Sequence, residues 1–285
     1  MAEPARRPLA LVTGASSGIG LTFCEVLAEH GHDLVLVARR GDRLRLLADR
    51  LARERGITAH VCSVDLSVPG AAEGVLAFTQ DRSLEVDVLV NNAGYGLPGS
   101  FLDSPWDTHR AWLEVMAVQW LHLTHLYLPA MLDRRAGRII NVASLAAFCP
   151  EPPGSLYPAV KAFMVGSTRA LSRDLRGTGV TATAVCPGFT DSEFHDVLGS
   201  TETVRKIPRI MWMRARPVVE EGWRAARLGR PVVIAGFCNK CVAALCWLLP
   251  GWLLDALAPK AVLERTRIPA KRERGGTAPS PTKRA

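Results

Sequence analysis

Residues 9–20 read Leu-Ala-Leu-Val-Thr-Gly-Ala-Ser-Ser-Gly-Ile-Gly, an apolar run followed by three closely spaced glycines. The apolar run Leu9–Thr13 predicts a buried strand, and the pattern of residues 18–30 predicts a helix. The glycines between them form a tight turn through which the backbone can approach a pyrophosphate, while the start of the helix offers free N–H groups and a partial positive charge. The predicted cradle consists of Gly14, Ser16, Ser17, Gly18, Ile19 and Gly20.

The same alternation of short apolar runs and longer amphipathic stretches continues along the chain, as in a parallel sheet covered on both faces. The predicted strands are Leu9–Thr13, Asp33–Ala38, Thr58–Val64, Val86–Val90, Arg138–Val142, Thr181–Val185 and Val232–Ala235. The predicted helices are 18–30, 41–55, 68–82, 108–133, 156–176 and 217–228. We therefore expect the α/β class, with a Rossmann-type, doubly wound, seven-stranded parallel sheet, helices on both faces, and ligands at the carboxyl ends of the strands.

Composition and charge narrow the class of protein. The chain has 285 residues, of which 48% are apolar and 22% charged, as in an ordinary folded domain. The net charge is +8, but eight basic and two acidic residues follow Pro259. The body of the chain is therefore nearly neutral, and we expect no nucleic-acid partner.

Three parts are expected along the chain. Residues 1–236 form the Rossmann domain, which includes a substrate loop at 189–216; an apolar helical segment, 237–258, follows; and residues 259–285 form a basic, largely disordered tail. Each half of the apolar segment is too short to span a bilayer. Tryptophans beside basic residues in 241–267 suit peripheral contact with an anionic membrane surface. Capping of the substrate pocket or burial against a second subunit satisfies the same composition, so both interpretations stay open.

Seven cysteines and the lack of a secretory signal at the N-terminus predict a reducing, cytoplasmic location. Cys238 and Cys241 form a C-x-x-C pair, but a zinc site needs a second pair of ligands, which Cys246 alone does not complete. We therefore expect no metal.

Further motifs follow the glycine turn in order: Asn91-Asn92-Ala93-Gly94, Ser144, Tyr157-x-x-x-Lys161 and Pro187-Gly188. With the G-x-x-x-G-x-G spacing of the turn, they make residues 8–235 resemble the classical short-chain dehydrogenase/reductase (SDR) family. The resemblance implies a nicotinamide-dependent oxidoreductase that acts on CH-OH groups, with Ser144, Tyr157 and Lys161 as its catalytic residues.

The end of the second strand indicates the cofactor. Enzymes that prefer NAD place a carboxylate there for the ribose 2′-hydroxyl. Here the strand ends in Ala38-Arg39-Arg40, so we expect NADP(H), with Arg39 paired to the 2′-phosphate and Arg40 flanking the adenine. The resemblance implies further contacts: Asp65 with the adenine amino group, Asn91 in the adenosine pocket, and Thr190, just past Pro187, with the carboxamide. Asn92 is expected to brace the sheet instead.

Tyr157 and Lys161 lie four residues apart at the start of a predicted helix and so share one face. A phenol with an ordinary pKa near 10 is a poor acid or base at neutral pH, and a nearby ammonium favours the phenolate. By resemblance, Tyr157 protonates the carbonyl oxygen as hydride arrives, Ser144 hydrogen-bonds that oxygen, and Lys161 tunes Tyr157 and holds the nicotinamide ribose.

Met116 departs from the family pattern, which has an asparagine thirteen residues before the proline of Leu128-Pro129-Ala130-Met131. That asparagine is thought to hold a water that links the lysine to solvent, and a thioether does not reproduce its hydrogen bonds. Gln119 is the nearest amide, but it lies elsewhere around the helix. If a backbone carbonyl holds the water, activity survives. Otherwise the relay is weakened, and the alternative is a non-catalytic NADP(H)-binding sensor or scaffold.

The residues that follow Ser144 are mostly apolar, and the substrate loop carries the large apolar side chains Phe189, Phe194, Met211, Trp212 and Met213. These residues favour a small hydrophobic carbonyl compound, a ketone or aldehyde, or the matching alcohol. Relatives in the family pair through the two long helices, here 108–133 and 156–176, which implies a homodimer or homotetramer.

Overall fold

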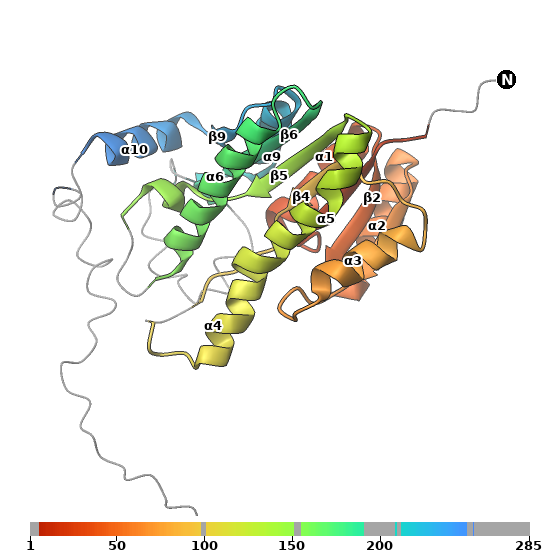
Figure 1. Ribbon diagram of the computed structural model, residues 1–285, viewed down its shortest axis with the longest axis horizontal. Coiled ribbons are helices and arrows are strands. Elements are labelled where there is room, and N and C mark those ends of the chain that lie inside the picture. The colour runs from red at the N-terminus through yellow and green to blue at the C-terminus, as the bar shows by residue number, and fades with distance from the viewer. Residues whose placement is uncertain are drawn as a thin grey trace, which may run out of the picture.

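The computed structural model in Figure 1 describes residues 6–97, 101–150, 155–190, 209, 212–249 and 253. Within these residues the centre is a seven-stranded parallel sheet of order β3-β2-β1-β4-β5-β6-β9. The strands are β1 Leu9–Thr13, β2 Asp33–Ala38, β3 Ala59–Ser63, β4 Val88–Asn91, β5 Gly137–Val142, β6 Val180–Cys186 and β9 Val232–Ile234. The strand order reverses between β1 and β4, and their carboxyl ends open the crevice where ligands bind in such sheets. The predicted fold is confirmed.

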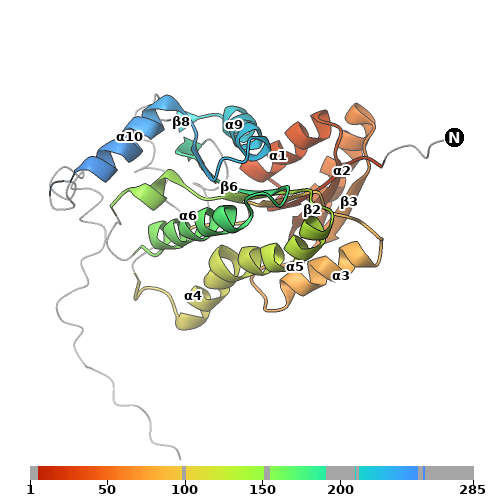
Figure 2. The ribbon, with the colours of Figure 1, turned by 45° about the horizontal axis from the view of Figure 1, so that its top comes forward.

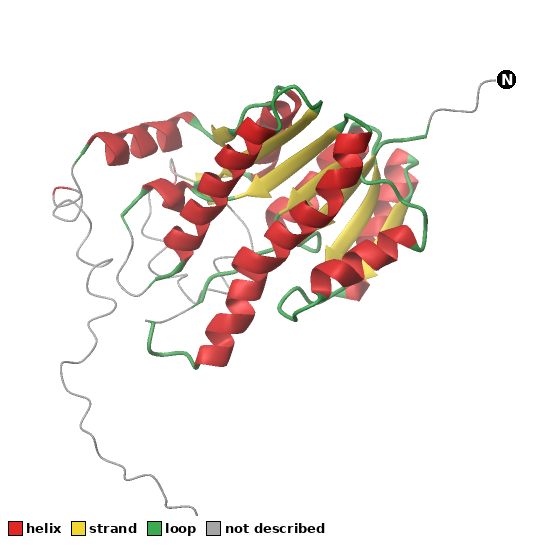
Figure 3. Ribbon diagram, in the orientation of Figure 1, coloured by secondary structure: helices red, strands yellow, loops and turns green. Residues whose placement is uncertain are grey.

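Helices cover both faces of the sheet, as Figures 2 and 3 show. One face carries α1 (Gly18–Glu29), α2 (Gly41–Arg55) and α9 (Ala215–Arg227). The other carries α3 (Ala71–Gln80), α5 (Gln119–Asp133) and α6 (Tyr157–Asp174). Because alternate residues of a strand face opposite sides, Val12 of β1 packs toward the first group and Leu11 toward the second. Burial on both faces explains why the strands read as continuous apolar runs.

The long helix expected at 108–133 is interrupted. It consists of α4 (Trp106–Leu113), one π-helical segment, η1 (Glu114–Val118), and α5. A π-helical segment holds an extra residue per turn and shifts the side chains that follow it around the helix axis. Met116, the departure from the family pattern, lies at the centre of η1.

The segment that follows the sheet contains α10 (Phe237–Leu248), which matches the first half of the predicted apolar helical segment. The predicted substrate loop begins and ends with two short paired strands, β7 (Phe189–Thr190) and β8 (Trp212–Met213). Most of the loop between them and the predicted basic tail lie outside the described residues. Among the described helices, none has the length and apolar character needed to cross a membrane.

Candidate active site

The glycine turn forms a closed cradle at the carboxyl end of β1. Gly14 and Gly18 have φ angles of +67° and +55°, which favour glycine. A Cβ atom on Gly20 would lie 2.3 Å from the carbonyl oxygen of Gly14, so the helix packs directly onto the turn. Ser17 is the N-cap of α1, whose first turn has no side-chain cap and no acidic residue. The first N–H groups of α1 are thus available to an anion, and the cradle fits a pyrophosphate.

Asn92 ties this cradle to the neighbouring strand. Its Nδ2 donates to the carbonyl oxygens of Thr13 at 2.9 Å and Gly14 at 3.3 Å, and its backbone N–H donates to the Thr13 hydroxyl at 2.9 Å. The prediction that Asn92 braces the sheet is confirmed.

The two arginines after β2 have different partners. Arg40 is the residue at the glycine turn: its Nη2 donates to the hydroxyls of Ser16 and Ser17, both at 3.0 Å. Arg39 has a side chain that is 67% exposed, and its Nη1 lies 4.0 Å from the Asp65 carboxylate. Arg40 is the N-cap of α2, and the change of chain direction there folds its guanidinium back onto the turn. Both cations directly follow β2, whose last residue is the uncharged Ala38.

Asp65 and Asn91 occupy different environments. The Asp65 carboxylate follows β3, accepts a hydrogen bond from the Ser67 N–H at 2.9 Å, and faces Arg39. Asn91 is buried, and its Nδ2 donates to Thr124 at 3.1 Å and to Asn141 at 2.9 Å. The Asn91 side chain therefore joins β4, β5 and α5, while its buried Oδ1 has no hydrogen-bond partner among the described residues. Its place in an adenosine pocket stays a prediction.

The three predicted catalytic residues meet beyond the carboxyl end of β5. Ser144 follows that strand, and its Oγ accepts the N–H of Ala146 at 3.1 Å. The Tyr157 hydroxyl, at the start of α6, hydrogen-bonds Ser144. Lys161 lies one turn later, with Nζ 5.8 Å from the centre of the Tyr157 ring and 2.7 Å from the Val142 carbonyl oxygen, to which it donates.

Burial dominates the titration of this group. It raises the pKa of Tyr157 to about 12, against the opposing effect of the Ser144 hydrogen bond. It also lowers the pKa of Lys161 to about 8. The expectation that the ammonium moves the pKa of Tyr157 downward is therefore not met in this structure, where desolvation of the phenolate is the largest cause and raises the pKa.

The turn that contains Pro187 and Thr190 lies beside this group. The Leu145 N–H, at the start of the 3₁₀ helix η2 (Leu145–Phe148), donates to the Pro187 carbonyl oxygen at 2.7 Å. The buried Thr190 hydroxyl donates to the Gly188 carbonyl oxygen at 3.1 Å. The turn is thus held by Leu145, the residue that follows Ser144. This places Thr190 near the catalytic residues, where its contact with the carboxamide of the nicotinamide is expected.

Met116 is buried, and its sulfur and carbonyl oxygen both accept hydrogen bonds. Its sulfur accepts the Tyr95 N–H at 3.4 Å, and its carbonyl oxygen accepts the Trp120 indole N–H at 2.9 Å. Gln119 points elsewhere, with Oε1 accepting the Ala72 N–H at 2.8 Å, so it does not replace the missing asparagine.

Sequence reasoning missed two residues of this region. Cys186, the last residue of β6, is a buried thiol close to Lys161, and burial raises its pKa to about 12. Asn239 on α10 packs against Gly188. The available signals were the place of Cys186 at the carboxyl end of a strand and the occurrence of a single amide in the apolar segment 237–249.

Known proteins share this arrangement. The sequence model of the short chain dehydrogenase family matches residues 8–203. The chain belongs to that family. It is 33% identical over 235 residues to the 7β-hydroxysteroid dehydrogenase of Collinsella aerofaciens, which covers 81% of this chain and 86% of the relative. Membership in the short chain dehydrogenases makes the chain an oxidoreductase.

Two solved structures share the fold over nearly the whole chain. A short-chain dehydrogenase from Sphingobium yanoikuyae in complex with NADPH has a TM-score of 0.73 and 29% identity, with 94% of this chain and 99% of that chain covered. The bulky-bulky ketone specific alcohol dehydrogenase from Comamonas testosteroni has a TM-score of 0.70 and 26% identity, with 94% and 98% covered. The likeness therefore extends beyond the residues of the family model.

Proposed function

We propose that this short chain dehydrogenase is NADP(H)-dependent and interconverts a hydrophobic ketone or aldehyde and its alcohol, with Tyr157 as the acid/base. The observation that carries the proposal is the Tyr157 hydroxyl hydrogen-bonded to Ser144 beside the buried Lys161. Bound NADPH supplies the hydride at this place.

The choice of NADP(H) rests on charge and geometry at the end of β2. The uncapped start of α1 and the glycine turn suit the pyrophosphate. Arg40 is already held beside Ser16 and Ser17, and Arg39 lies next to it in sequence. Guanidinium groups bind phosphate through paired N–H donors, so both arginines suit a 2′-phosphate. The solved relative from Sphingobium yanoikuyae binds NADPH, in agreement with this proposal.

The catalytic residues are poised for reduction. With a pKa of about 12, Tyr157 is protonated at neutral pH and can donate its proton to a carbonyl oxygen without prior ionisation. The Ser144 hydroxyl accepts the Ala146 N–H and hydrogen-bonds Tyr157, so it lies beside the proton donor, where a carbonyl oxygen can replace Tyr157 as its partner. Lys161, with a pKa of about 8, is mostly charged at neutral pH, and the Val142 carbonyl fixes its direction.

The surroundings of Tyr157 favour an apolar substrate. Half-buried side chains that cluster with it include Leu97, Leu113 and Leu156, together with Tyr95. Apolar walls bind hydrophobic ligands, while a few polar groups fix their orientation. The names of the relatives agree with this inference, since one acts on a hydroxysteroid and another on bulky ketones.

A screen of hydrophobic ketones and aldehydes with NADPH oxidation as the readout tests the function. We expect turnover with at least one bulky ketone, and we expect Tyr157→Phe to abolish it while NADPH binding stays within about twofold, because only the hydroxyl is lost. Activity retained in Tyr157→Phe would place the chemistry elsewhere. NADPH binding without turnover across the panel would instead support the sensor or scaffold.

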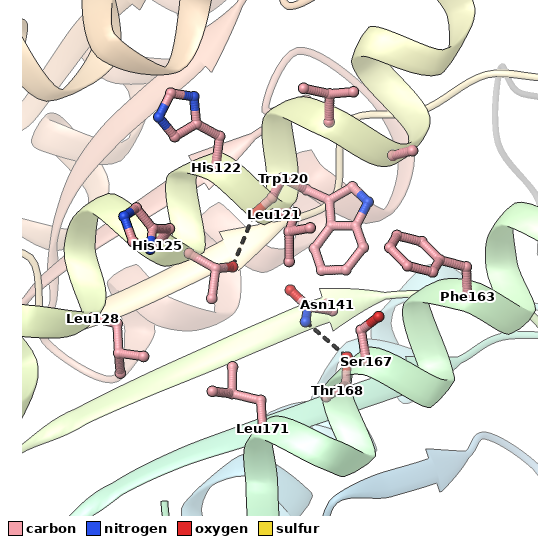
Figure 4. Close-up of a pocket in the computed structure, with 13 residues that line it drawn as sticks. Trp120, Leu121, His122, His125, Leu128, Asn141, Phe163, Ser167, Thr168 and Leu171 are labelled. Atoms are coloured by element: carbon pink, nitrogen blue, oxygen red, sulfur yellow. Dashed lines mark hydrogen bonds between the residues drawn. The ribbon is translucent and has the colours of Figure 1, made fainter. Parts of the chain in front are cut away.

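We propose that a second copy of the chain covers the outer faces of α5 and α6. Figure 4 shows a groove of about 590 Å³ between these helices, with Leu121 and Phe163 at its sides and Asn141 at its floor. Leu121 is 42% exposed and Phe163 is also exposed. Pairing through these helices is what the SDR resemblance implies, and it would remove their apolar side chains from water.

We further propose that the outer side of α10 contacts an anionic membrane surface. Phe237, Trp247 and Leu248 are exposed there, Trp247 to 84%. The basic residues of 259–285 follow in sequence and would add about 1 kcal/mol of attraction per cation near such a surface.

Co-sedimentation with vesicles at low and high salt tests this contact. We expect pelleting that requires anionic lipid, weakens with salt, and falls when Phe237, Trp247 and Leu248 are replaced by Ser. Leu46→Ser, at a side chain that is 71% exposed on α2, is the matched control. A protein that stays in the supernatant throughout would show that the apolar side of α10 serves as a pocket cap or a subunit interface.

A further inference from the structure

The helix α10 places one amide, that of Asn239, directly against the turn that follows β6. Asn239 is 2% exposed. A Cβ atom on Gly188 would lie 2.4 Å from both Nδ2 and Oδ1 of Asn239, so the amide covers the bare Cα of that glycine. The helix can approach the turn this closely because residue 188 has no side chain.

The direction of the Asn239 amide is fixed by its neighbours. Nδ2 donates to the carbonyl oxygen of Ala235 at 2.8 Å and contacts the sulfur of Met213 at 3.3 Å. A flipped amide would bring Oδ1 against the Ala235 oxygen, and two acceptors would then face each other. Oδ1 therefore faces Gly188, and it has no hydrogen-bond partner in the part of the chain that the structure describes.

The buried oxygen lowers stability. A buried acceptor without a donor is destabilising, and an apolar side chain here would remove it but would also leave the Ala235 carbonyl oxygen without the Asn239 donor. Stabilisation of the fold alone therefore does not explain the unpaired Oδ1, which lies against Gly188.

Gly188 links two parts of the candidate active site. Its carbonyl oxygen accepts the Thr190 hydroxyl at 3.1 Å. The preceding residue, Pro187, accepts the N–H of Leu145, the residue next to Ser144. A displacement of Gly188 would move Thr190 and strain the connection to the loop of Ser144.

We propose that Asn239 is a positioning residue that sets the Pro187–Thr190 turn, and with it the nicotinamide end of NADP(H). This role rests on the proposed NADP(H)-dependent function, and it assigns a task to α10, which lies outside the residues 8–203 matched by the family model. Misplacement of a reacting group by about 1 Å lowers rates by up to about a hundredfold.

Asn239→Leu tests the role, because leucine has the same number and branching of side-chain heavy atoms and lacks both polar atoms. We expect a Tm close to that of the wild type, a Kd for NADPH raised about tenfold, and kcat lowered ten- to a hundredfold on the best ketone of the screen. The Kd for 2′,5′-ADP, which has the 2′-phosphate but no nicotinamide, should stay within about twofold. Lys240→Ala, next to Asn239 on α10, is the matched control, since it breaks the ion pair with Glu221 of α9 without touching Gly188.

Three results would overturn the role. The first is an Asn239→Leu variant with wild-type NADPH affinity and kcat. The second is an equal loss of NADPH and 2′,5′-ADP binding, which indicates a general disturbance. The third is Lys240→Ala matching the effect of Asn239→Leu. A wild-type chain that binds no NADPH would overturn the proposed function as well, so the two failures are distinguishable.

A double-mutant cycle gives a second measurement. Gly188 does not have a positive φ, so the backbone accepts alanine, and the nearest atoms to the new methyl group all belong to Asn239. Gly188→Ala should lower NADPH affinity strongly beside Asn239 and less strongly beside Asn239→Ala, where the methyl group finds room. Equal losses on both backgrounds would show that the contact does not position the turn.

Discussion

Replacing Arg40 by Ala should weaken NADPH binding far more than NADH binding. Its guanidinium is held at the glycine turn by the hydroxyls of Ser16 and Ser17, both at 3.0 Å, so little ordering remains when a 2′-phosphate arrives. A hydrogen bond to a charged group contributes about 1.5–3 kcal/mol. Since 1.4 kcal/mol corresponds to a factor of ten, the Kd for NADPH should rise about 10- to 100-fold. Arg39 is 67% exposed and screened by water, so Arg39→Ala should have the smaller effect.

Fluorescence titration of NADPH and NADH against the wild type and both variants measures these differences. Arg53→Ala, at an exposed arginine in the last turn of α2, controls for the loss of one positive charge. The NADH affinities should agree within about twofold throughout. Equal wild-type affinities for the two cofactors, or an Arg40→Ala variant that loses both alike, would refute the reasoning.

The other predictions concern proton transfer, pH and assembly. Lys161→Ala should weaken both NADPH binding and turnover, unlike Tyr157→Phe, which should lose turnover alone. Met116→Asn should raise the rate or shift its pH profile if the relay limits turnover, and an unaltered profile would favour the backbone-carbonyl route. Because the folded pKa of Lys161 is lowered to about 8, the unfolded chain binds more protons between pH 8 and the ordinary lysine pKa. The unfolding free energy of the wild type relative to Lys161→Met should therefore rise from pH 8 to 9.5 in urea titrations, and a flat difference would contradict this pKa. Leu121→Arg should reduce the mass in light scattering to that of a monomer, whereas Leu46→Arg should not; a monomeric wild type would disprove the proposed pairing.

The sheet is predictable from the sequence because its strands are buried on both faces. Leu9–Thr13 and Asp33–Ala38 match their predicted bounds, since each apolar run stops where the chain meets glycines or arginines. The π-helical segment Glu114–Val118 is not predictable in this way. No glycine or proline marks it, and its geometry accompanies tertiary contacts of Met116 with Tyr95 and Trp120.

The residues of the candidate site are likewise predictable only in part. Ser144, Tyr157 and Lys161 are predictable because strand ends and a four-residue helical spacing bring them together. The directions of Arg40 and Asn91 depend on neighbours far away in sequence, and so does the pKa of Tyr157, which reflects burial that no motif contains. Asn239 belongs to no local pattern, and only the packing of α10 on Gly188 reveals it.

The two sides of α10 have a consequence for regulation. Its inner side holds Asn239 against Gly188, and its outer side exposes Trp247. A rigid helix moves as one body. A partner that shifts the outer side of α10 would therefore also shift Asn239, and with it the turn beside Thr190. Thermodynamic linkage makes such an effect reciprocal: if occupancy of the outer side changes the affinity for the cofactor by some factor, the cofactor changes affinity for that partner by the same factor. Binding of a partner at the outer side of α10 and binding of the cofactor at the turn would then depend on each other.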